Sequence, residues 1–153
     1  MDKVAADLTR ILGPERLLWE REHLATYGFD GTAALYAEAG CVALPETTAE
    51  VTQVVRYAGQ NKIPVVTRGS GTGLSGGSVP VRGCIVLCLV QMDRVLELDQ
   101  KNLTIHVESG VVTQKSGRAR RCRRAPLSAR SGFDEDFNDR GQRSGELRRF
   151  ARA

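Results

Sequence analysis

A run of glycines interleaved with hydroxyl side chains is the part of the chain best suited to bind an anion. Between Thr67 and Gly77 five of eleven residues are glycine, and the run directly follows the apolar segment Ile63–Val66. Glycine tolerates positive φ angles and leaves backbone N–H groups uncovered, so several of them can face one bound phosphate. A strand that leads into such a loop is a common way to hold a phosphate or pyrophosphate.

Three known phosphate-binding patterns compete for this loop. The spacing of Gly71–Gly76 fits the Gly-x-Gly-x-x-Gly dinucleotide fingerprint, but that fingerprint must open a helix, and Ser78–Gly83 cannot begin one. A Walker A loop ends in Gly-Lys-Ser/Thr, and this loop contains no lysine. A kinase glycine loop needs a valine where Ser78 stands. A glycine-rich turn without any ligand stays open as a fourth interpretation.

The elements around the loop should form a β-α-β unit that positions it. Cys41–Leu44 is typical of a short buried strand, and Thr47-x-x-Glu50 is a capping box that predicts the start of a helix. Apolar residues at helical spacing extend this helix to about Asn61. The next strand is expected at Ile63–Thr67, and the crossover between the two strands should be right-handed.

Further elements are expected on both sides of this unit. Amphipathic patterns predict helices over residues 3–12 and 14–26, with Gly13-Pro14 between them. Cys84–Val90 is an apolar run typical of a buried strand. Val95–Leu98 and Leu103–Val107 predict a hairpin.

Several motifs in a fixed order connect the chain to a known family. They are Tyr27-x-x-Asp30, Pro45-x-Thr47-x-x-Glu50-Val51, Ile63 to Gly77, Met92-x-Arg94-Val95-Leu96-Glu97-Leu98-Asp99, and Val107-Glu108-x-Gly110-Val111. Over about residues 5 to 114 the chain thereby resembles the FAD-linked oxidases of the vanillyl-alcohol-oxidase type. Within that family the resemblance is greatest to the glycolate oxidase flavin subunit and the D-lactate dehydrogenases.

The resemblance implies an α+β fold, the N-terminal half of a two-subdomain FAD-binding domain. Residues 1–36 would be a helical lead-in, and residues 37–114 would contain the β-α-β unit and the hairpin. FAD would lie between the two halves, with backbone N–H groups of the glycine loop bound to its pyrophosphate. The implied cofactor-binding residues are Val66, Thr67, Arg68, Gly69, Ser70, Gly71, Thr72, Gly73, Leu74, Gly76, Gly77 and Met92.

Three of these residues carry additional expectations. Arg68 has two open interpretations, a cofactor contact and a solvated arginine at a strand end. Met92 would lie near the flavin, although an isolated methionine is more commonly a core residue. Some relatives attach flavin through a histidine in this loop; the matching position here is Thr72, so the resemblance implies non-covalent FAD.

The resemblance also implies a reaction. Intact relatives oxidise a 2-hydroxy acid such as glycolate or D-lactate and pass a hydride to the flavin. Their substrate domain, with its metal-binding histidines, lies downstream, and iron–sulfur partner subunits accompany some of them. We therefore expect FAD binding but no catalytic residue and no metal site within this chain, weakened affinity for FAD, and no turnover by the chain as written.

The charge distribution divides the chain at Gln114. Up to this residue there are ten Lys/Arg and thirteen Asp/Glu, a net charge of −3, whereas residues 115–153 carry twelve Lys/Arg and five Asp/Glu, a net charge of +7. The resemblance stops at the same point. Back-translation of Gly132–Ala153 with permitted codons, read one base later, yields the family's missing Gly-Gly-Asn and Asn-x-Gly-Gly elements. We therefore expect residues 115–153 to be an out-of-frame, disordered basic tail.

Two other classes of function are compatible with the sequence. The arginines of residues 118–130 could bind nucleic acid weakly and in a salt-sensitive way, but no aromatic platform or known motif predicts specific binding. A fragment that folds poorly is the third possibility.

The remaining polar residues give no further site. His23 and His106 lack partners at metal-ligand spacing, so no metal site is expected. Cys41, Cys84 and Cys88 are predicted to be isolated buried thiols, with Cys84 and Cys88 on one face of a strand, which suits a reducing cytoplasm. No signal peptide is visible, and the longest apolar run has seven residues, so no membrane span is expected.

Overall fold

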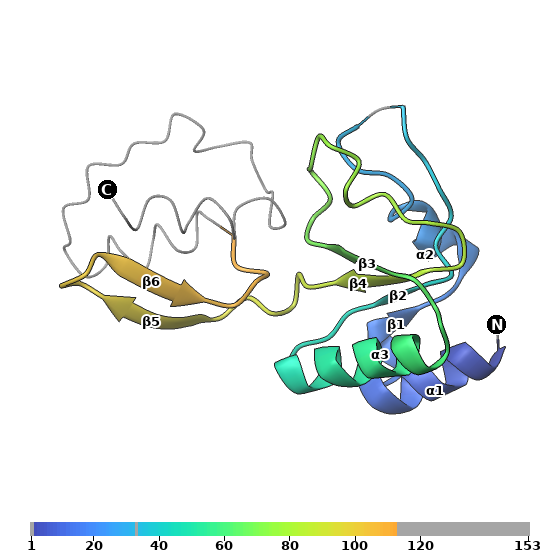
Figure 1. Ribbon diagram of the computed structural model, residues 1–153, viewed down its shortest axis with the longest axis horizontal. Helices are drawn as coiled ribbons and strands as arrows, with labels where there is room; N and C mark the ends of the chain where they lie inside the picture. The colour runs from blue at the N-terminus through green and yellow to red at the C-terminus, as the bar shows by residue number, and fades with distance from the viewer. Residues whose placement is uncertain (1, 33, 113–153) are drawn as a thin grey trace.

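A four-stranded sheet forms the centre of the computed structural model, which describes residues 2–32 and 34–112 (Figure 1). The expected basic tail of residues 115–153 lies outside the described residues. The strand order is β1-β2-β4-β3, in which β2, β4 and β3 run parallel and β1 is antiparallel to β2. The strands are β1 (Leu17–Leu18), β2 (Cys41–Ala43), β3 (Val65–Arg68) and β4 (Ile85–Cys88).

The predicted β-α-β unit is present, with β4 inserted between its two strands. Helix α3 (Thr48–Gln60) connects β2 to β3, and both strands pair with β4. The capping box is confirmed, because the Thr47 hydroxyl accepts the Glu50 N–H at 3.2 Å while the Glu50 carboxylate accepts the Thr47 N–H at 3.2 Å. The helix ends at its C-cap Asn61, as the sequence predicts.

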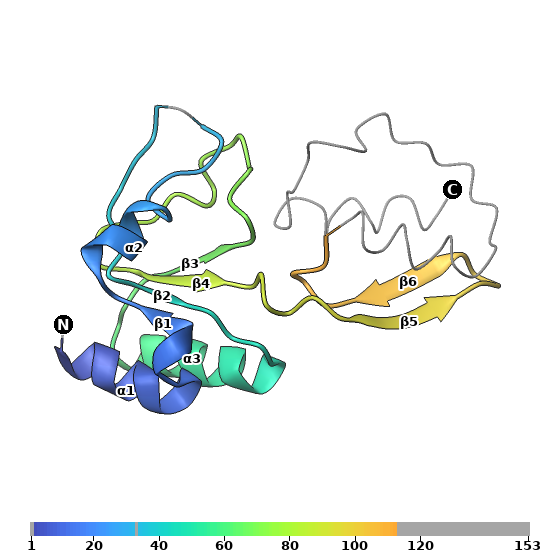
Figure 2. The same cartoon turned by 180° about the vertical axis from the view of Figure 1, so that it is seen from behind.

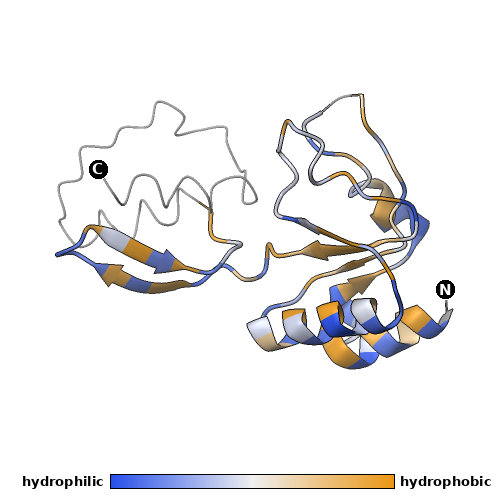
Figure 3. Cartoon of the chain, viewed as in Figure 1, coloured by the Kyte–Doolittle hydropathy of each residue, from blue (hydrophilic) through white to orange (hydrophobic). Residues whose placement is uncertain are grey.

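Two apolar layers cover the two faces of the sheet. Helices α1 (Asp2–Leu12) and α3 cover one face, where Leu8 and Leu12 pack with Ile85 and Leu87 of β4. Cys84, Val86 and Cys88 lie on the other face beside Leu24 of the short helix α2 (Arg21–Ala25), so the two thiols share one face as expected. In Figure 3, β4 is hydrophobic along its length, whereas α1 and α3 alternate between hydrophobic and hydrophilic residues.

The predicted helix over residues 14–26 is wrong. The structure has a 3-10 turn at Pro14–Arg16, then β1, then α2. Leu17 pairs with Ala43 and Leu18 with Val42, and the two leucines point to opposite faces of the sheet. Pairing with β2 buries the two adjacent leucines on opposite faces of the sheet. A helix with one apolar stripe could not bury both in this way. Tertiary context therefore overrides the helical pattern.

The predicted hairpin is confirmed and extends away from the main sheet, as both views show (Figures 1 and 2). It consists of β5 (Val95–Asp99) and β6 (Thr104–Val107), which pair antiparallel. At its base Arg94 Nη2 lies 2.7 Å from a carboxylate oxygen of Glu108. Helices packed on a mixed sheet, together with a separate hairpin, confirm the expected α+β fold.

Candidate functional site

The glycine loop leaves the carboxyl end of β3 and runs beside the segment that follows α2. Figures 1 and 2 both show these two segments together on the side of the sheet opposite α1 and α3. A backbone hydrogen bond of 2.7 Å joins the Gly31 N–H to the Gly73 carbonyl. A Cβ at Gly31 would lie 2.8 Å from that carbonyl oxygen, so glycine is needed for the two backbones to approach this closely.

Arg68 is buried and ties the start of the loop to the segment after α2. The residue is 5% exposed, and Nη1 donates to the carbonyls of Tyr27 at 2.9 Å and Phe29 at 3.1 Å. Nη2 donates to the Ser70 carbonyl at 3.3 Å, and the guanidinium lies 5.2 Å from the Tyr27 ring centroid. Burial lowers the pKa of Arg68, while Cys88, Tyr27 and Asp30 raise it. The interpretation of Arg68 as a solvated arginine is therefore wrong.

Asp30 is a second buried charged residue at this site. It is 6% exposed, and its Oδ1 accepts the Thr32 N–H at 2.8 Å. The Thr32 N–H lowers the pKa of Asp30, and the N–H groups of Ser78 and Gly76 lower it further, against the raising effect of burial. The other carboxylate oxygen of Asp30, Oδ2, is buried and has no hydrogen-bond partner within the described residues. The local sequence did not predict this burial, although Tyr27-x-x-Asp30 was among the motifs that carried the resemblance.

The middle of the loop presents polar groups that the protein itself does not use. The N–H groups of Gly71, Thr72 and Gly73 donate to no protein acceptor within the described residues, 2–32 and 34–112. The Oγ1 atom of Thr72 is buried and has no hydrogen-bond partner in this part of the chain. Buried polar groups are normally paired, and successive amides without a protein acceptor can bind an anion. These groups fit the pyrophosphate of a dinucleotide.

The other residues of the predicted site have diverse surroundings. Val66 is partly buried against the layer that contains α2. Leu74 is 68% exposed, and Thr67 and Gly77 are also exposed. Gly76 has a φ of 74°. Met92 is 6% exposed at the base of the hairpin, where its carbonyl accepts the Gly110 N–H at 2.8 Å.

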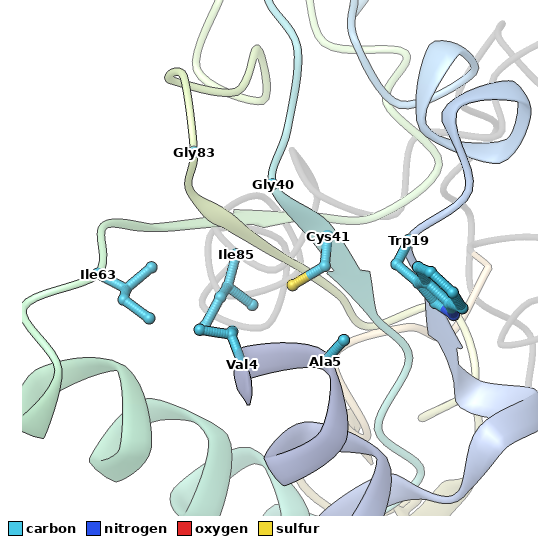
Figure 4. A pocket seen from close by; sticks show the side chains of 8 residues that line it. All are labelled: Val4, Ala5, Trp19, Gly40, Cys41, Ile63, Gly83 and Ile85. Atoms are coloured by element: carbon cyan, nitrogen blue, oxygen red, sulfur yellow. The ribbon is translucent and has the colours of Figure 1, made fainter. Parts of the chain in front are cut away.

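A cavity of about 200 Å³ lies elsewhere, at the amino ends of the parallel strands (Figure 4). Gly40, Ile63 and Gly83 line it just before β2, β3 and β4 begin, and Val4 and Trp19 close its sides. Its lining contains no charged side chain. In open parallel sheets ligands bind at the carboxyl ends of the strands, so this cavity is distinct from the glycine-loop site.

The three cysteines of the described region are free and buried, as predicted. Burial raises the pKa of the Cys41 thiol to about 11, and Cys84 raises it as well. In the region that the structure covers, no group of three or more His, Cys, Asp or Glu residues could hold a metal ion. None of the helices in that region has both the length and the apolar character needed to cross a membrane.

Comparison with known proteins places the chain in a family. The family model described as an FAD binding domain matches residues 39–123, which is more than half of the chain. The chain therefore belongs to the FAD binding domain family, and FAD is the cofactor of that family. None of the matches supports the nucleic-acid alternative.

Curated relatives include two enzymes named for 2-hydroxy acids. The glycolate oxidase subunit GlcD of Bacillus subtilis is 34% identical over 110 residues, which is 72% of this chain and 23% of the relative. D-lactate dehydrogenase of Anaerostipes hadrus is 35% identical over 103 residues, 66% of this chain and 22% of the relative. The chain thus spans about a quarter of the length of these relatives, and its likeness to the predicted family is confirmed.

Solved structures share the fold. A p-cresol methylhydroxylase matches with a TM-score of 0.74 at 23% identity, over 82% of this chain and 25% of that chain. The 4-ethylphenol oxidase of Gulosibacter chungangensis matches with a TM-score of 0.71 at 27% identity, over 81% of this chain and 25% of that chain. These matches confirm the expected α+β FAD-binding fold.

Proposed function

We propose that the glycine loop binds the pyrophosphate of FAD in a flavin-dependent oxidoreductase that acts on 2-hydroxy acids. The observation that carries the proposal is the row of unpartnered amides at Gly71, Thr72 and Gly73, beside the unpartnered hydroxyl of Thr72. N–H donors fixed in advance around an anion bind it without a reorganisation cost. The proposed cofactor-binding residues are those expected from the sequence. Arg68 would contribute indirectly, through its hydrogen bond to the Ser70 carbonyl in the loop.

The substrate class rests on the names of the relatives. Relatives that match this chain are named glycolate oxidase subunit, D-lactate dehydrogenase and probable D-2-hydroxyglutarate dehydrogenase. Each of these names contains a 2-hydroxy acid. When bound, FAD would supply a ring that accepts the hydride from the substrate carbon. Because the matches leave about three quarters of each relative uncovered, we place substrate binding and the chemical step outside the matched stretch.

Two finer points belong to this proposal. Thr72 has no group that forms a covalent bond to flavin, and it stands where some relatives carry the attaching histidine, so we propose non-covalent FAD. A 2-hydroxy acid and iron–sulfur partner subunits are the proposed partners of the intact protein.

Removal of the Thr72 hydroxyl tests the proposal. Thr72→Val removes Oγ1, which has no protein partner, so folding stability should stay the same or rise while FAD affinity falls by about tenfold. The matched control is Thr52→Val, which removes an exposed hydroxyl that donates to the Thr48 carbonyl within α3. Dissociation constants for FAD would be measured by flavin fluorescence. Equal affinities of the two variants would contradict a cofactor role for the Thr72 hydroxyl.

A further inference from the structure

Gly31 lies outside the glycine loop but contacts the centre of the loop through its backbone. Its N–H donates to the Gly73 carbonyl at 2.7 Å. A Cβ built on Gly31 would lie 2.8 Å from the same oxygen, 2.8 Å from a methyl carbon of Leu74 and 3.0 Å from the Thr72 carbonyl oxygen. The carbonyl oxygens of two successive loop residues, Thr72 and Gly73, therefore both lie against Gly31.

These two carbonyls determine the direction of the amides that share their peptide groups. The Thr72 carbonyl belongs to the same peptide group as the Gly73 N–H, and the Gly73 carbonyl belongs to the same group as the Leu74 N–H. In a trans peptide the C=O and N–H bonds point in opposite directions, and no peptide bond among the described residues is cis. The Gly73 N–H, which has no protein acceptor in this part of the chain, therefore points away from Gly31.

We propose that Gly31 is a positioning residue that turns the central peptide groups of the glycine loop so that the Gly73 N–H faces the pyrophosphate. Gly73 is buried, and buried N–H groups without an acceptor are rare, which favours a bound anion at this position. Rotation of either peptide group would present a carbonyl oxygen to the anion in place of an N–H group. This inference rests on the proposed FAD function and adds a residue that the glycine motif does not contain.

The test compares Gly31→Ala with Gly40→Ala in the full chain. Gly40 is a matched control because its N–H also donates to a carbonyl, that of Cys84 at 2.8 Å, and its Cβ would lie 2.9 Å from the Gly83 carbonyl oxygen. Neither glycine has a positive φ, so alanine acts through crowding alone in both variants. Gly40 directly precedes β2 at the amino ends of the parallel strands, whereas the glycine loop leaves the carboxyl end of β3.

Ligand affinity separates positioning from a general loss of structure. Gly31→Ala should weaken FAD binding about tenfold more than it weakens riboflavin binding, because riboflavin lacks the pyrophosphate. Gly40→Ala should leave the ratio of the two affinities unchanged, even where it lowers stability. An unchanged ratio in Gly31→Ala, or an equal change of the ratio in both variants, would overturn the proposal.

A measurement without any variant covers the case in which Gly31→Ala does not fold. NMR detects a scalar coupling across a short hydrogen bond, and we expect one between the Gly31 amide nitrogen and the Gly73 carbonyl carbon of the unmodified chain. Inorganic pyrophosphate should then shift the Gly73 amide resonance more than that of Gly31. Absence of the coupling would overturn the proposal, as would a Gly73 amide that does not respond in a chain that binds FAD. If the chain binds neither FAD nor pyrophosphate, the proposed function fails, while the coupling still decides whether Gly31 holds the loop.

Discussion

The guanidinium of Arg68 occupies the space that a side chain at position 71 would need. A Cβ built on Gly71 would overlap Nη2 of Arg68, and Gly71 also has a φ of 81°. Two residues of the same loop thus depend on each other, because Arg68 can reach the carbonyls of Tyr27 and Phe29 when position 71 carries no side chain. The glycine serves the fold of the loop as well as access for a ligand.

Gly71→Ala should therefore destabilise the chain by about 2–4 kcal/mol, from the positive φ and the clash with Arg68 combined. The matched control is Gly59→Ala in α3, where a Cβ would meet nothing within 4 Å. That control should stabilise the chain by about 0.5–1 kcal/mol. Urea unfolding measures both changes, and a neutral Gly71→Ala would disprove the packing of Arg68 beneath this glycine.

Removal of the Arg68 guanidinium should also cost stability. Arg68→Met keeps an apolar stem but leaves the carbonyls of Tyr27, Phe29 and Ser70 without this donor, at a cost of about 2–4 kcal/mol. Arg56→Met, on the exposed side of α3, should change the free energy of unfolding by less than about 0.5 kcal/mol. Chemical denaturation of the two variants checks this difference, and equal effects would argue against a structural role for Arg68.

The capping residue Glu50 should make stability depend on pH. Burial raises the pKa of Glu50, but hydrogen bonds from the Glu46 N–H, Arg16 and the Thr47 N–H outweigh it and lower the pKa overall. A carboxyl with a lowered folded-state pKa stabilises the fold above its unfolded pKa, and this contribution is lost as pH falls through the folded value. Stability from Glu50 should thus be complete at pH 7, begin to fall as pH drops below the unfolded pKa of about 4.3, and disappear only below the lowered folded-state pKa.

Glu50→Gln isolates this contribution. The variant should be about 1 kcal/mol less stable than the unmodified chain at pH 7, and the difference should vanish in acid. Glu97→Gln, an exposed position on β5, serves as the control at both pH values. A difference for Glu50→Gln that stays constant with pH would show that ionisation of Glu50 does not stabilise the helix.

Local patterns predicted most elements because those elements follow from short-range chemistry. The capping box from Thr47 to Glu50 and the hairpin depend on neighbouring residues, and both predictions are confirmed. The second strand of the hairpin begins at Thr104, because Leu103 lies in the turn with a φ of 53°. Leu17 and Leu18 were wrongly assigned to a helix because their burial depends on pairing with β2, about 25 residues away in the chain.

In the candidate site, too, features set by the local sequence were predicted and features set by distant segments were not. The glycine composition is a feature of the local sequence and predicted a loop whose N–H groups could bind an anion. In the described residues the N–H groups of Gly71, Thr72 and Gly73 have no protein acceptor. The burial of Arg68 and that of Asp30 could not be deduced in this way, because both depend on a segment about 40 residues upstream of the loop folding against it. The insertion of β4 between β2 and β3 is likewise a property of the assembled sheet.

Equilibrium titration of the purified full chain with FAD, and separately with riboflavin, tests the central claim most directly. The two ligands share the flavin ring, and FAD adds the pyrophosphate for which the amides of Gly71, Thr72 and Gly73 are proposed. We predict saturable binding of FAD that inorganic pyrophosphate competes away, with riboflavin at least about tenfold weaker. Equal affinities for the two ligands, or no saturable binding of FAD, would contradict the assignment of the glycine loop as the pyrophosphate site.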